Sequence, residues 1–140
     1  MADYTAIRDG LAAQLETVPT FLTVHATVPS RIVAPAAVVV PGRPVATYHD
    51  SMAGTSGGSL TVFSFELVCA VQSMTEAFSQ ATLDDLISGP NSVPAAIEAD
   101  PTLGGAAITC QVTQAVDYGV IAYADTEYIG ARFLLNAYGR

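Results

Sequence analysis

The sequence contains no lysine and no tryptophan, and its shortage of basic side chains limits what the chain can bind. All five basic residues are arginines, and they are outnumbered by thirteen acidic residues, which gives a formal net charge of −8 at pH 7. Binding to DNA through charge needs a basic stripe that neutralises phosphates. The charge balance therefore excludes a Coulombic nucleic-acid binder and predicts repulsion between this chain and nucleic acid.

Long hydrophobic runs are also missing. The longest apolar stretch, Ile32 to Val40, is interrupted by Pro35 and is far shorter than the ~18 residues that a membrane span needs. The first residues lack a basic region followed by an apolar core, so we expect no signal peptide. With 140 residues, 51% hydrophobic and 13% charged, the chain is typical of one compact globular domain, residues 1–140.

Cysteine and histidine are scarce, with two of each. Two cysteines cannot form a disulfide framework, and Cys69 and Cys110 both fall on the apolar side of alternating segments. We expect both to be buried as small hydrophobic side chains, with a disulfide as the alternative. No group of His, Cys, Asp or Glu has metal-ligand spacing, so no metal or other cofactor is predicted.

The last third, Ala106 to Tyr138, is the most regular part of the sequence. Apolar residues alternate with polar ones through Ile108, Cys110, Val112, Val116 and Tyr118. A shorter apolar piece follows Gly119, and Asp125-Thr126-Glu127 is a polar break. Beyond it, one side of the closing segment carries Ile129, Ala131, Phe133, Leu135 and Ala137. This period of two predicts strands with one face in a core.

The preceding part supplies helices and further strands. Asp3 is a plausible N-cap for an amphipathic helix of about fourteen residues that ends before Pro19. Phe21 to Ala26 and Ala36 to Val40 read as short strands, the second bounded by Pro35 and by Pro41-Gly42-Arg43-Pro44. Leu60 to Gln72 reads as a long strand whose core side carries Phe63, Phe65, Leu67, Cys69 and Val71.

Two further helices are expected between the long strand and the closing meander. Ser73-Met74-Thr75-Glu76 matches a capping box before a helix that carries Phe78, Leu83, Leu86 and Ile87. Ser92 can cap a short helix over Pro94 to Ala99. The order of elements predicts an α+β fold with a single mixed, mostly antiparallel β-sheet, and with two main helices and one short helix packed on one face.

Several tempting catalytic patterns favour a structural reading. Gly54-Thr55-Ser56-Gly57-Gly58 fits G-x-S-x-G, but a loop precedes it and a strand follows, whereas the nucleophile elbow needs a strand and then a helix. His49-Asp50 has no nucleophile beside it and reads as a surface pair, and His25 reads as a partly exposed strand residue. Asp84-Asp85 point about 100° apart on a helix, which favours a solvated face.

What remains is the surface. Tyr48 to Ser59 is rich in Gly and Ser, lacks apolar periodicity, and is longer than a hairpin needs, which is typical of functional loops. A proline-rich edge carries Arg31 and Arg43. These are properties of an assembly module, and we expect no enzymatic activity.

A set of short segments, in their order and spacing, extends over nearly the whole chain. They are Tyr4-Thr5-Ala6-Ile7-Arg8-Asp9-Gly10-Leu11, Pro35-Ala36-Ala37-Val38-Val39-Val40-Pro41-Gly42-Arg43-Pro44, Ala95-Ala96-Ile97-Glu98 with Leu103-Gly104-Gly105, Tyr118-Gly119, and Tyr128-Ile129-Gly130-Ala131-Arg132-Phe133. Together they resemble the tail terminator proteins of long-tailed (siphovirus-type) actinobacteriophages, whose fold is a mixed sheet flanked by helices.

The resemblance implies a structural virion protein that forms a homohexameric ring on the tail tube. Such a ring ends tube polymerisation and provides the docking surface for the head-completion complex. The implied partners are the chain itself, the tail tube protein and the head-completion or stopper protein, while DNA passes through the bore without specific binding. The implied location is the head-tail junction of the virion, after assembly in the host cytoplasm, with no membrane partner.

In related terminators an extended hairpin loop and exposed strand edges contact the neighbours and the tube. The segment of this chain that best fits such a loop is Tyr48 to Ser59. We therefore expect the assembly contacts on this loop and on the edges, at Tyr48, His49, Asp50, Met52, Thr55, Ser56, Arg31, Arg43, Tyr138 and Arg140.

Two alternatives stay open at this point. The first is a different head-tail connector ring, a stopper or an adaptor. The second, from another class, is a small α+β hydrolase or ligand-binding domain, although the sequence shows no convergent polar set of the kind that lines a cleft.

Overall fold

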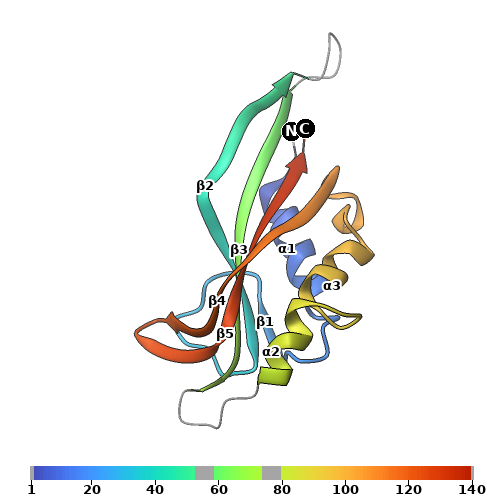
Figure 1. The fold of residues 1–140 in the computed structure, drawn as a ribbon. Helices are drawn as coiled ribbons and strands as arrows, with labels where there is room; N and C mark the ends of the chain where they lie inside the picture. Colours follow the sequence, from blue (N-terminus) through green and yellow to red (C-terminus); the bar gives the residue numbers. More distant parts are fainter. Residues whose placement is uncertain (1, 53–58, 74–79, 140) are drawn as a thin grey trace.

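The computed structural model describes residues 2–52, 59–73 and 80–139. In these ranges the chain forms one five-stranded sheet in the order β1-β2-β3-β5-β4, with three α-helices on one face (Figure 1). Only β1 and β2 run parallel, and all other neighbouring strands are antiparallel. The α+β prediction, a mixed and mostly antiparallel sheet covered by helices, is confirmed.

The helix α1 (Tyr4–Leu15) begins and packs as its sequence predicts. The side chain of Asp3 accepts hydrogen bonds from the backbone N–H groups of Thr5 and Ala6, so the N-cap is confirmed. The apolar stripe Ile7, Leu11 and Leu15 is buried against the sheet. The helix is 12 residues long and therefore slightly shorter than expected.

The two later helices complete the layer over the sheet. Helix α2 (Gln80–Ile87) buries Leu83 and Leu86, and α3 (Val93–Ala99) is capped by Ser92, whose hydroxyl accepts from the N–H of Ala95. A 3₁₀ turn, η1 (Leu103–Gly105), then leads into the meander. The expected capping box continues into residues 74–79 and so lies outside the described ranges, as does Phe78.

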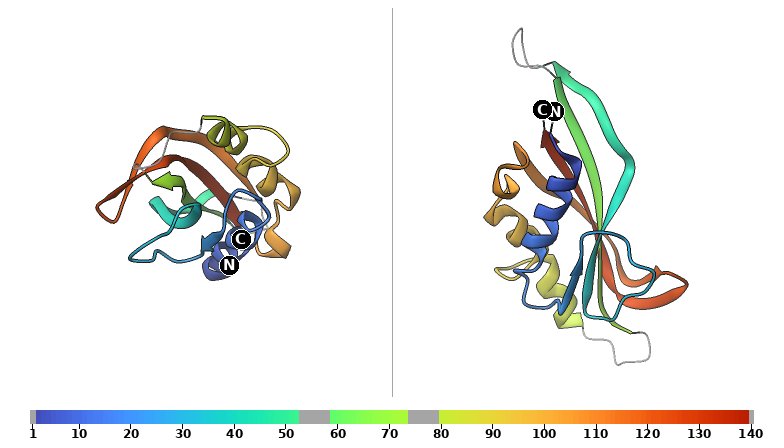
Figure 2. Two further views of the ribbon diagram at one scale, coloured as in Figure 1. Left: turned by 90° about the horizontal axis from the view of Figure 1, so that it is seen from below. Right: turned by 180° about the vertical axis from the view of Figure 1, so that it is seen from behind.

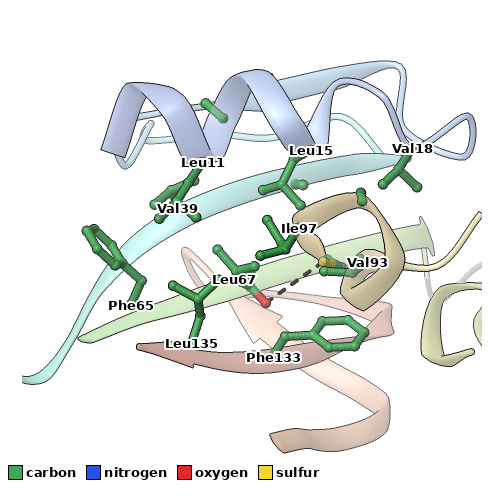
Figure 3. Packing of buried hydrophobic residues seen from close by; sticks show 14 of the residues in the cluster. Leu11, Leu15, Val18, Val39, Phe65, Leu67, Val93, Ile97, Phe133 and Leu135 are labelled. Carbon is green, nitrogen blue, oxygen red and sulfur yellow. Dashed lines mark hydrogen bonds between the residues drawn. The ribbon is translucent and has the colours of Figure 1, made fainter. Parts of the chain in front are cut away.

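The core lies between the helices and the central strands β3 (Ser59–Ser73) and β5 (Thr126–Gly139). Their inward rows face each other in register, with Phe65 opposite Leu135 and Leu67 opposite Phe133. Figure 3 shows these side chains beneath Leu11 and Leu15 of α1 and beneath Ile97 of α3. Both predicted rows, Phe63 to Val71 and Ile129 to Ala137, are buried as expected.

The strand β2 (Ala36–Met52) is much longer than predicted. It was expected to end at Val40, but it continues past Pro41 and Pro44 to Met52, so Tyr48 to Met52 and Ser59 belong to strands rather than to a loop. Strand β1 (Thr23–His25) pairs with only the first three residues of β2, which leaves the rest of β2 at the sheet edge. Proline is tolerated there, and the pairing with β3 shifts between Pro41 and Ala46.

The strand β4 (Thr109–Tyr123) also differs from its prediction. It runs through Gly119 as one strand, and its pairing with β5 shifts at two places, after Val112 and after Val116. Asp117 and Gly119 have φ of 55° and 118°, and such local bends change which face the following side chains occupy. Tyr118, expected in the core row, is therefore 45% exposed, and Ile108, which precedes the first residue of β4, is 46% exposed.

A second, smaller apolar cluster lies on the sheet face opposite the helices. Its members are Ile32, Ala36, Val38, Val68, Ala70 and Ile121. The irregular segment 26–35 covers this face, and two tyrosines of the β4–β5 hairpin hold it. Tyr123 donates a hydrogen bond to the carbonyl of Pro29, and Tyr128 donates to the carbonyl of Ile32 at 3.2 Å. The sequence pattern did not predict this contact.

Candidate assembly surfaces

The expected contact residues are spread over three parts of the molecule. Tyr48 is 60% exposed on β2, Arg31 and Arg43 are exposed, and Tyr138 is partly buried on β5. His49, Asp50 and Met52 lie in the β2 strand, while Thr55, Ser56 and Arg140 fall outside the described residues. The structure therefore brings Tyr48, Arg43 and the 49–52 segment onto one strand, with Arg31 and Tyr138 elsewhere.

The β2–β3 hairpin is the most prominent projection of the fold. At their far end, beyond the last β3–β5 pair Thr61–Gly139, these two strands extend past both chain termini and away from the helices (Figures 1 and 2). Val45 and Tyr48 are exposed on β2 before this end, where β3 is still paired with β5. The β2–β3 pairs Ser51–Leu60 and Met52–Ser59 hold the strands together at the far end. This hairpin, the β2–β3 arm, is formed by strands where the sequence indicated an irregular loop for Tyr48 to Met52.

Arg43 borders an open hollow of about 290 Å³ on the face without helices. Its other walls include Glu66, Thr113, Leu134 and Asn136. The floor is already internally paired, because the Ser64 hydroxyl donates to Oδ1 of Asn136 at 3.1 Å. The hollow is wide and mixed in polarity, and its polar atoms do not converge on one point as they do in a ligand pocket.

Arg132 links three strands on the same face. Its Nη1 donates to Oδ2 of Asp117 at 2.9 Å, and its Nη2 donates to the carbonyl of Ala122 at 2.9 Å. Its Nε lies 3.1 Å from Oε1 of Glu66 without the alignment of a hydrogen bond, so that contact is a charge attraction. Arg132 therefore fixes the bent part of β4 to β5 and β3.

Besides Ile108 and Tyr118, the sequence did not indicate four further apolar side chains as exposed. They are Leu22, Val28, Val33 and Val120. Leu22, in the segment expected as a short strand from Phe21 to Ala26, is 82% exposed, and Val33 is 78% exposed. A signal was present, since Pro29 and Pro35 enclose Val33 in a segment unlikely to pair as a strand. Their surroundings at the sheet edges could not be read from the sequence.

The titratable candidates lie apart from one another. His25 is partly buried on β1, as expected, and Asp84 and Asp85 are exposed on α2. Cys69 and Cys110 are free and buried, which confirms their prediction as small hydrophobic residues. Burial raises the pKa of both thiols, that of Cys110 to about 11 with a contribution from the Asp100 carboxylate.

The remaining patterns can be placed as well. Gly54 to Gly58 lie outside the described ranges, and the next element is strand β3 rather than the helix that a nucleophile elbow requires. Within residues 2–52, 59–73 and 80–139, no three His, Cys, Asp or Glu side chains gather as a metal site. None of the described helices has the length and apolar character needed to cross a membrane.

No protein-family model matches this sequence, and comparison with curated proteins gives no match either. The resemblance to tail terminators therefore stays a hypothesis.

Proposed function

We propose that this chain is a tail terminator, a structural virion protein of a long-tailed phage. It forms a homohexameric ring at the head-tail junction, caps the tail tube, stops tube polymerisation and presents a surface to the head-completion protein. The chain acts through surface shape and repeated contacts, and it needs no cofactor.

The observation that carries this proposal is the β2–β3 arm. At the end of this hairpin the pairs Ser51–Leu60 and Met52–Ser59 lie beyond the last β3–β5 pair, and Val45 and Tyr48 are exposed on β2 just before that end. The free edge of β2 offers unpaired backbone groups and exposed apolar side chains to a neighbouring molecule. An extended hairpin is also the part through which tail terminators are expected to reach their neighbours and the tube.

Charge supports the same function. Six chains carry a formal charge of about −48 (6 × −8), a value that applies to the assembled ring. A bore lined by acidic side chains lets DNA pass without arrest, because attraction to the phosphates would slow its movement. A connector that had to grip DNA would need the basic residues that this sequence lacks.

Deleting the coding sequence from the phage that carries it tests the function. Electron microscopy of the lysate should show overlong tails and full heads without tails. Tails of normal length that are joined to heads would refute the proposal. Tails of normal length beside heads that leak DNA would instead identify a stopper.

A second test uses purified components. Sedimentation should give a ring of about 87 kDa (6 × 14.5 kDa), either for the protein alone or after addition of tail tubes, because closed rings form by repeated subunit contacts. A chain that remains at 14.5 kDa beside tail tubes, or that hydrolyses ester substrates, would contradict a terminator.

A further inference from the structure

A hollow of about 210 Å³ lies between the irregular segment 26–35 and the end of the β4–β5 hairpin. Figures 1 and 2 show this segment beside the curled end of the hairpin. Two tyrosine hydroxyls anchor it there, because Tyr123 donates to the carbonyl of Pro29 and Tyr128 donates to the carbonyl of Ile32. The part of the segment between these two anchors is therefore held over the hairpin. Both sides contribute to the walls of the hollow, which include Ser30, Arg31, Ile32, Tyr123, Thr126 and Tyr128.

Three of these wall residues carry hydrogen-bond donors that have no partner among the described residues. They are Ser30 and Arg31 from the segment and Thr126 from the hairpin. The salt bridges of the described residues all involve Arg132, so the guanidinium of Arg31 is not neutralised by a carboxylate there. The tyrosine hydroxyls differ, since each already donates to a backbone carbonyl. Free donors therefore border the hollow from both sides.

No acidic side chain is among the described residues that line this hollow. Thr126 and Tyr128 are alternate residues of β5 and share the face towards the segment, so Glu127 between them lies on the other face. Asp125 is exposed in the turn of the hairpin. The net charge of −8 repels anions at long range, but at physiological salt it is screened beyond about 8 Å. Arg31 therefore affects an ion in the hollow more than distant carboxylates do.

We propose that this hollow binds a small oxyanion, a phosphate or a carboxylate, between Arg31, Ser30 and Thr126. A guanidinium donates a fork of N–H groups that matches the oxygens of both anions, and each hydroxyl donates one further hydrogen bond. Because the donors belong to two segments of the chain, the bound ion forms a third link between segment 26–35 and the hairpin. The site does not depend on the proposed function.

Titration of the isotope-labelled full chain with sodium phosphate, followed by NMR, tests the site. Resonances of residues 26–35 and 123–128, including the Nε–H of Arg31, should move with one dissociation constant. It should be on the order of 1 mM, as expected for a few hydrogen bonds to a small charged ligand. Sodium acetate is the carboxylate probe, and saturable shifts with phosphate, acetate or both show which oxyanion the site accepts. Sodium chloride at the same ionic strength is the control and should leave these resonances in place.

Single substitutions then identify the donors. Arg31→Gln, at an exposed position, removes the charge and should weaken binding at least about tenfold. Arg31→Lys keeps the charge but loses the fork, so its affinity should lie between the two. Thr126→Val keeps the shape of the side chain without its hydroxyl and should weaken binding about three- to tenfold. Arg43→Gln makes the same change in net charge at the other hollow and should alter binding by less than about twofold.

Four results overturn the site. The first is the absence of saturable shifts up to about 50 mM phosphate and acetate, and the second is an equal response to chloride. The third is an Arg31→Gln variant that binds as tightly as the unsubstituted chain. The fourth is an Arg43→Gln variant that loses as much affinity as Arg31→Gln, which would mean that only the net charge matters. None of these results concerns tail length, so the proposed function stands or fails separately.

Discussion

The hydroxyl of Tyr118 donates a 2.7 Å hydrogen bond to the carboxylate of Asp84, which ties the edge strand β4 to helix α2. This bond raises the pKa of Tyr118 above its ordinary value, because loss of the phenolic proton would break the bond and place two negative charges together. The stabilising effect of the bond is therefore fully present below about pH 10 and is lost as the pH rises through the raised pKa.

We expect Asp84→Asn to lower the pKa of Tyr118 towards its ordinary value. The measurement is an ultraviolet titration of tyrosinate, with the Tyr118→Phe variant subtracted to isolate this phenol from the other tyrosines. Asp85→Asn, one residue along α2, is the matched control and should leave the titration unchanged. Equal titration curves for the Asp84→Asn protein and the unsubstituted one would show that the bond does not form in solution.

At Gly130 the backbone of β5 lies close to that of β3. A Cβ atom at this position would lie 2.0 Å from the carbonyl oxygen of Cys69, which is backbone and cannot turn aside. Gly130→Ala should therefore lower the free energy of unfolding by about 1–3 kcal/mol, as overpacking does. Denaturant titration measures the loss. Ala122→Val, at an exposed position on β4, is the control and should change stability by less than about 0.5 kcal/mol.

Both thiols should be unreactive in the folded protein. With the pKa of Cys110 raised to about 11, only about a thousandth of it is thiolate at pH 8, and the pKa of the deeper Cys69 is raised further by burial. A disulfide reagent should label two thiols quickly in denaturant and none at that rate in native buffer. Because native burial disfavours the thiolates, stability should fall as the pH rises above the ordinary thiol pKa of about 8.5. A rapidly labelled native thiol would contradict this, and Cys110→Ala would show which one it is.

Arg132 should matter for the local order of β4 more than for global stability. Its ion-paired side chain is about a quarter exposed (26%), so Arg132→Met should cost about 1 kcal/mol or less of unfolding free energy. Amide hydrogen exchange near Ala122 should nevertheless accelerate, since the substitution removes the bond to that carbonyl and the pairing with Asp117. Glu66→Gln removes only the third contact and should leave exchange near Ala122 unchanged. Unchanged exchange near Ala122 in both variants would mean that the bent part of β4 keeps its structure without Arg132.

The arm should be needed for assembly and dispensable for folding. Tyr48→Ser removes a large exposed side chain of β2 that contributes little to the core, so the free energy of unfolding should change by less than about 0.5 kcal/mol. Tail length in a phage that carries the variant should become irregular. Deletion of Thr55 to Gly58 should have the same effect. Thr47→Ser, an exposed neighbour on β2, is the control. Tails of normal length in the Tyr48→Ser phage would show that the arm only joins two strands and makes no assembly contact.

The parts of the fold with a simple apolar period could be predicted from the sequence. The rows in β3 and β5 alternate without interruption, and α1 combines a cap at Asp3 with a stripe from Ile7 to Leu15. These features are local, since neighbouring residues alone decide them. The α+β class followed from their order along the chain.

What could not be predicted depends on the position in the sheet. Pro41 and Pro44 read as strand breakers because the sequence does not say that β2 lies at an edge, where a missing N–H is harmless. The bends at Asp117 and Gly119 moved Tyr118 out of the core row. The exposure of Leu22 and Val120 depends on which strands lie at the edges of the sheet. This is known only once the order of the strands in the sheet is known.

The prolines of β2 and the bends of β4 also affect how readily this protein aggregates through its strand edges. A chain that is half hydrophobic and rich in long strands is at risk of stacking into amyloid-like fibrils when its free edges are straight and continuous. Pro41 and Pro44 remove donors from one edge, and the kinked backbone at Asp117 and Gly119 disrupts the other. Both features therefore work against edge-to-edge stacking of copies of this chain.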